Sequence, residues 1–67
     1  MDLSLMTPEQ GKRLAEAVRE ACLKAAREGY EQAAMSGLCH EGAVEASLDA
    51  VRMLDIAALV EQVKNRV

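Results

Sequence analysis

The sequence predicts an all-α protein, a helical hairpin of residues 8–35 and 40–54 followed by a short third helix at residues 56–64. Its 67 residues are rich in Ala, Leu, Glu, Lys and Arg, which are good helix formers. Apolar residues recur at the three- and four-residue spacing of a helix. Strong start and stop signals flank the first of these stretches. The length allows a single domain, residues 1–67.

The first helix has a clear beginning and end. Thr7 offers a capping hydroxyl, Pro8 suits the first helical position, and Gln10 can complete a capping box. Gly37 is the natural residue for the left-handed position after the helix. Gly29, in the helix interior, costs roughly 1 kcal/mol relative to Ala, so it indicates a close approach of another backbone.

Small apolar residues dominate one face of this first helix, suited to tight packing: Leu14, Ala17, Val18, Ala21, Cys22, Ala25, Gly29 and Ala33. A second, narrower apolar strip lies beside that face and contains Leu23, Ala26 and Tyr30. Either another chain contacts this strip or the third helix covers it.

The second helix begins near Cys39–Glu41 and is apolar over more than half of its circumference. One face is formed by Val44, Ser47, Leu48, Val51 and Leu54. A single partner helix cannot cover the rest, so the pattern predicts an oligomeric bundle, with a homodimer favoured over another protein partner. Its expected interface is Leu23, Ala26, Tyr30, Ala43, Ala46, Ala50 and Met53.

The third helix is predicted from a break in the apolar phase. Ile56, Leu59, Val60 and Val63 do not continue the face of the second helix, and Asp55 is a good N-cap for a new start. The alternative is one long second helix with a wandering apolar stripe.

Composition excludes several classes of function. A net charge of −3 disfavours nucleic acid as a partner, because phosphate binding needs a clustered basic face. No apolar run approaches the length of about 18 residues that spans a membrane. The first residues lack the pattern of a signal peptide, and with two cysteines the expected location is the cytoplasm. The single Tyr, without Phe or Trp, leaves an Ala-rich core that buries little area.

Cys22, Cys39 and His40 are the residues to weigh for chemistry. A structural zinc site needs four ligands, and the spacing of these three matches no zinc pattern. Cys22 lies about 15 residues from the turn, roughly 20 Å along the helix, which exceeds the reach of a disulfide to Cys39. We expect no catalytic residue, no cofactor and no enzymatic activity. Cys39 and His40, at the start of a helix, are the candidates for a reactive thiol or a metal ligand pair.

The acidic residues Glu41, Glu45 and Asp49 lie on one helix face, where we interpret them as solvated.

A resemblance is carried by three segments: residues 29–33 (Gly-Tyr-Glu-Gln-Ala), 36–42 (Ser-Gly-Leu-Cys-His-Glu-Gly) and 52–55 (Arg-Met-Leu-Asp). They resemble a group of short uncharacterised bacterial helical proteins with a Ser-Gly-Leu-Cys turn, some labelled acetyltransferase. The resemblance implies a small helical protein. It does not supply the activity, because acetyl-CoA enzymes need a pyrophosphate-binding loop and a sheet, which this sequence lacks. A likeness to one tetratricopeptide repeat also favours a helical hairpin.

Three functions are weighed on sequence grounds. The first is a non-enzymatic interaction module, or complex subunit, that self-associates as a helical bundle. The alternative is a thiol- or metal-based regulatory sensor centred on Cys39 and His40, joined by Cys22 of a second chain. A truncated acyltransferase relative is a third possibility, and it predicts binding of acyl-CoA.

Overall fold

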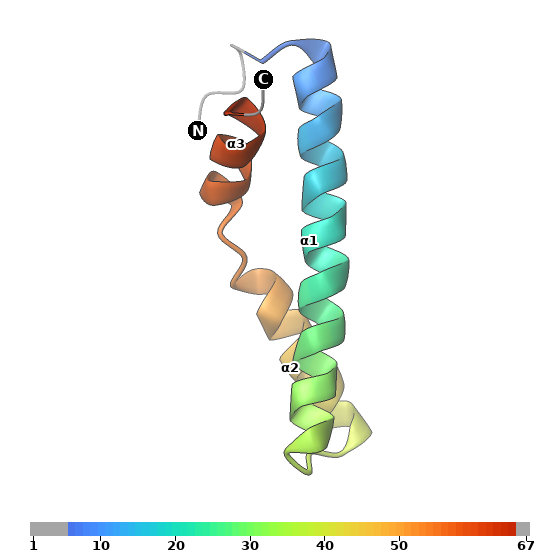
Figure 1. Ribbon diagram of the computed structural model, residues 1–67. Helices are drawn as coiled ribbons and strands as arrows, with labels where there is room; N and C mark the ends of the chain where they lie inside the picture. Colours follow the sequence, from blue (N-terminus) through green and yellow to red (C-terminus); the bar gives the residue numbers. More distant parts are fainter. Residues whose placement is uncertain (1–5, 66–67) are drawn as a thin grey trace. The chain divides into compact units, whose positions relative to one another are not determined.

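The computed structural model describes residues 6–65, and this part of the chain contains three helices and no strand (Figure 1). They are α1 (Pro8–Met35), α2 (His40–Arg52) and α3 (Ile56–Lys64). The predicted all-α class is therefore confirmed, with α1 and α3 at the predicted bounds. Helix α2 ends two residues earlier than predicted, and the alternative of one long second helix is wrong because residues 53–55 break it.

The chain divides into two compact units, which are described separately. The first unit combines the N-terminal part of α1, up to Glu20, with α3. The second unit, Ala21–Leu54, combines the rest of α1 with α2. Helix α1 thus runs through both units. No helix in the described part of the chain is long and apolar enough to cross a lipid bilayer.

Both ends of α1 have the predicted caps. The Gln10 backbone N–H donates to Thr7 Oγ1 at 3.1 Å, and the Thr7 N–H donates to Gln10 Oε1 at 3.0 Å, which is a capping box. Gly37 has φ 92°, as predicted for the left-handed position after the helix. The Gly37 N–H donates to the Ala34 carbonyl, and the Leu38 N–H donates to the Ala33 carbonyl, both at 3.0 Å. The chain therefore turns sharply into α2.

Helices α1 and α2 approach most closely at Gly29. A Cβ atom added there would lie 3.0 Å from the Ala46 carbonyl oxygen, 3.0 Å from Ala50 Cβ and 3.2 Å from Ser47 Cα. These distances leave no room for a side chain, so the close approach predicted from this glycine is confirmed. Small residues on both helices permit it, because they keep the two backbones close.

The face of α2 that packs on α1 is its small-residue side, which corrects the expected interface. Ala43, assigned to an interface with another chain, is 0% exposed within its own chain. Ala46 and Ala50 lie in the contact with α1. Val44 and Leu48, which belong to the predicted face of larger residues on the second helix, remain 37% and 47% exposed. The larger side chains lie beside the contact because the close helix approach has no space for them.

The first unit has its core on α3. Asp55 caps this helix, since its carboxylate accepts a hydrogen bond from the Ala58 N–H at 3.0 Å. Val60 and Val63 are 4% and 5% exposed and are the most buried side chains of α3. The predicted strip Leu23–Tyr30 belongs to the second unit.

Candidate functional site

The turn end of the second unit holds a pair of ring side chains, Tyr30 of α1 and His40 of α2. The Tyr30 hydroxyl and His40 Nδ1 lie 2.8 Å apart in a hydrogen bond. The rings are edge-on, with centroids 5.6 Å apart and an interplanar angle of 66°. Sequence reasoning missed this pair, although the turn at Gly37 brings the end of α1 beside the first residue of α2. The pair ties the two helices together and occupies one nitrogen of the imidazole.

Cys39 sits at the N-cap of α2 and is exposed. Its side chain makes no capping hydrogen bond. Both cysteines are free thiols, with Cys22 half-buried on α1. Cys39 and His40 line an open hollow with Glu41 and Glu45, yet no cluster of three or more potential metal ligands occurs in the described part of the chain. The hydrogen bond to Tyr30 uses Nδ1 of the imidazole and leaves Nε2 as its other nitrogen.

A continuous apolar flank lies along one side of the α1–α2 hairpin. The contact between Tyr30 and His40 defines this side, and helix periodicity of about 100° per residue places further side chains on it. On α1 these are the predicted strip residues, and on α2 they are two residues from the predicted face of larger side chains. We call this surface the hairpin flank: Leu23, Ala26, Tyr30, Val44 and Leu48.

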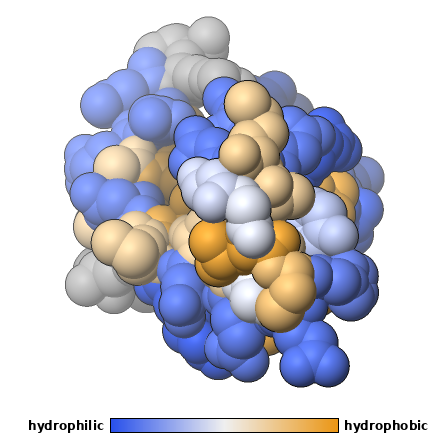
Figure 2. All heavy atoms as spheres, turned by 90° about the horizontal axis from the view of Figure 1, so that it is seen from below, coloured by the Kyte–Doolittle hydropathy of each residue, from blue (hydrophilic) through white to orange (hydrophobic). Residues whose placement is uncertain are grey.

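The hairpin flank is apolar and partly exposed. Leu23, Leu48 and Val44 are 54%, 47% and 37% exposed, while Ala26 and Tyr30 are half-buried. Apolar side chains also gather among polar ones on the face drawn in Figure 2. The sequence signal that could have placed Val44 and Leu48 on this surface is Gly29. A glycine in the first helix requires small residues opposite it, and this turns the alanine face of α2 inward and leaves Val44 and Leu48 exposed.

The remaining predicted interface residue, Met53, lies elsewhere. It is 83% exposed at the C-cap of α2. Nine residues separate it from Val44, so helix periodicity places the two on opposite sides of α2. Met53 therefore does not belong to the hairpin flank.

Charge is distributed unevenly along the second unit. The end near the turn carries Glu31, Glu41 and Glu45, and we call it the acidic end. The other end carries Lys24, Arg27 and Arg52, and we call it the basic end. Two more acidic residues lie between them, and one of these, Asp49, bonds Arg52 Nη1 at 2.7 Å through Oδ1. All of these side chains are exposed, so the hairpin has a charge gradient along its length.

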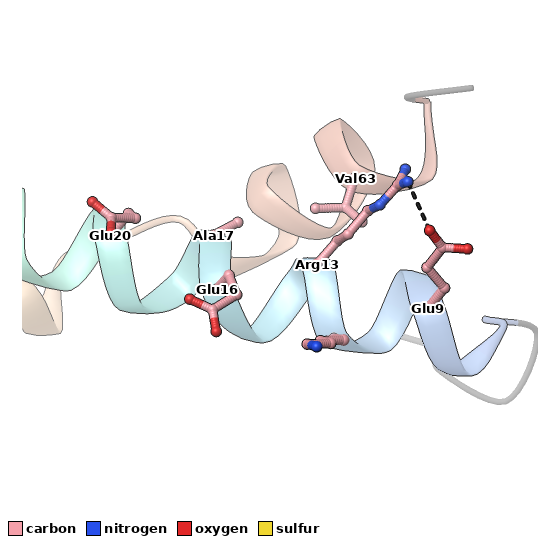
Figure 3. A pocket seen from close by; sticks show the side chains of 7 residues that line it. Glu9, Arg13, Glu16, Ala17, Glu20 and Val63 are labelled. Carbon is pink, nitrogen blue, oxygen red and sulfur yellow. Dashed lines mark hydrogen bonds and ion pairs between the residues drawn. The ribbon is translucent and has the colours of Figure 1, made fainter.

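The first unit has a second open hollow between α1 and α3, with Val63 at its base (Figure 3). Charged residues of both signs line it, and one ion pair joins Arg13 Nη2 to Glu9 Oε1 at 2.9 Å. These side chains are 56% and 74% exposed, so the pair contributes at most about 1 kcal/mol. Nothing in this hollow converges on a common point, as a ligand site requires.

Comparison with known proteins found no match among family models, curated proteins or solved structures. The functional argument therefore rests on the geometry described above. The resemblance to short bacterial helical proteins stays a prediction.

Proposed function

We propose that this chain is a non-enzymatic interaction module that associates with a second copy of itself through the hairpin flank. The observation that supports the proposal is the exposure of Leu23, Val44 and Leu48 on one continuous side of the hairpin. A small helical protein gains stability when it covers such side chains, because burying apolar area contributes roughly 25 cal/mol per Å².

The size of the flank sets the expected affinity. Fully burying a Leu or Val side chain contributes about 1.5–3 kcal/mol, and these three side chains are already partly covered. Association also costs at least about 4 kcal/mol, so the net gain is small. The interface belongs to the small, weak class, and we expect a dimer that dissociates on dilution.

The test compares two substitutions of exposed apolar residues on α2. Leu48→Gln lies on the flank and removes its centre, so the variant should stay monomeric at about 500 µM. Met53→Gln lies on the opposite side and should dimerise like the wild type. Circular dichroism checks that both variants keep their helix content, and sedimentation equilibrium measures the mass. Equal association of the two variants contradicts the proposal.

A second candidate function is a thiol- or metal-based sensor centred on Cys39 and His40. It is supported by the exposure of Cys39 and by the absence of a capping hydrogen bond to its side chain. Its test is the rate at which Cys39 exchanges with a disulfide probe in a Cys22→Ala variant, together with zinc titration. A rate equal to that of a model peptide thiol, and no zinc binding, removes this candidate. For either function the proposed location is the cytoplasm, where free thiols persist.

A further inference from the structure

We infer that two copies pair antiparallel through the hairpin flank, so that the acidic end of each hairpin lies against the basic end of the other. This inference rests on the proposed self-association and adds its geometry. The two-fold axis runs perpendicular to the helices, at the level where Gly29 meets α2. Two arguments support it. An oppositely charged pair on each helix has its midpoint at nearly the same height along the hairpin, and a parallel arrangement would bring like charges together.

One oppositely charged pair of α2, Glu45 and Arg52, is symmetric about one level of the hairpin. Glu45 and Arg52 are seven residues apart, which places them on the same edge of α2, about 10 Å apart along its axis. Their midpoint lies between Leu48 and Asp49. That level falls within the Ala46–Ala50 segment that contacts Gly29.

The charged residues of α1 are centred on the same level. Lys24 and Glu31 are likewise seven residues apart on one edge, with a midpoint close to Gly29. A rotation of 180° about an axis at this level exchanges the two members of each pair. Glu45 then lies toward Arg52 of the second copy, and Glu31 toward Lys24 of the second copy. One axis therefore serves both helices.

The parallel arrangement lacks this complementarity. If the two hairpins stacked with their turns at the same end, Glu31, Glu41 and Glu45 of both copies would gather together. Like charges in close contact are unfavourable, and the basic ends would meet in the same way. Because the apolar flank alone has no direction along the helices, the charges select the antiparallel pairing.

A charge exchange between α2 positions tests the inference. In the Glu45→Arg variant, the new guanidinium of each copy lies toward Arg52 of the other copy, so like charges meet at both ends of the interface. In the Arg52→Glu variant, the new carboxylate of each copy lies toward Glu45 of the other copy in the same way. Each variant alone should self-associate about tenfold more weakly than the wild type. Mixed in equal amounts, the two variants should form a heterodimer with about wild-type affinity, because every Glu–Arg pair is restored between chains.

The controls separate the geometry from self-association itself. Glu61→Arg makes the same charge change on exposed α3 and should leave the affinity unchanged. If the wild type dimerises and each single variant associates as strongly as the wild type, the antiparallel geometry is overturned while self-association stands. If the wild type is a monomer at about 500 µM, both the geometry and the proposed function are overturned.

Discussion

Replacing Gly29 with alanine tests the close helix contact of the second unit. In an open helix this substitution stabilises by roughly 1 kcal/mol, because alanine is the better helix former. Here the new methyl carbon would lie 3.0 Å from the Ala46 carbonyl oxygen and 3.0 Å from Ala50 Cβ. Helix α2 must therefore move away by several tenths of an ångström. Overpacking of this kind costs about 1–3 kcal/mol, which offsets or exceeds the gain in helix propensity, so we expect a net destabilisation of up to about 2 kcal/mol.

Gly11 provides the matched control on the same helix. A Cβ atom added at Gly11 meets nothing within 4 Å, so Gly11→Ala should raise the free energy of unfolding by about 0.5–1 kcal/mol. Thermal unfolding followed by circular dichroism measures both variants at one low concentration. For a chain of 67 residues, 1 kcal/mol corresponds to a shift in Tm of about 4–8 °C. If Gly29→Ala raises Tm as Gly11→Ala does, the close contact between α1 and α2 is refuted.

Three further predictions concern stability and association. Ala43→Leu should destabilise by about 1–3 kcal/mol in chemical denaturation, because Ala43 is fully buried, whereas Ala57→Leu on the exposed side of α3 should change little. Asp55→Ala removes the cap of α3 and should cost about 1 kcal/mol, and an unchanged midpoint would contradict the capping role. Raising the salt concentration from about 0.05 to 0.5 M should weaken dimerisation severalfold in sedimentation experiments, because it screens the exposed charges, and a stronger dimer would argue for purely apolar pairing.

Local signals in the sequence were enough to predict the helices. Three capping signals each involve hydrogen bonds or backbone angles within four residues of their own position. They are the Thr7–Gln10 capping box, Gly37 and Asp55, and all three are confirmed as caps. The end of α2 was placed two residues too late, because Met53 and Leu54 are good helix formers and no glycine marks the stop.

The orientation of α2 could not be predicted from its own sequence. Its apolar surface is wide, so periodicity permits either the large or the small residues to face inward. The decisive constraint is Gly29, which lies on the other helix and requires small partners such as Ala46 and Ala50. The pair of Tyr30 and His40 was missed for the same reason, since it depends on a contact between helices.

The solution mass of the wild-type chain tests the proposed self-association most directly. Sedimentation equilibrium over about 5–500 µM, with and without reductant, measures it without any substitution. The proposal predicts a monomer at the lowest concentration and a mass that approaches twice that value at the highest, unaffected by reductant. A monomer throughout the range contradicts self-association through the hairpin flank, and a dimer that disappears on reduction assigns the association to the cysteines instead.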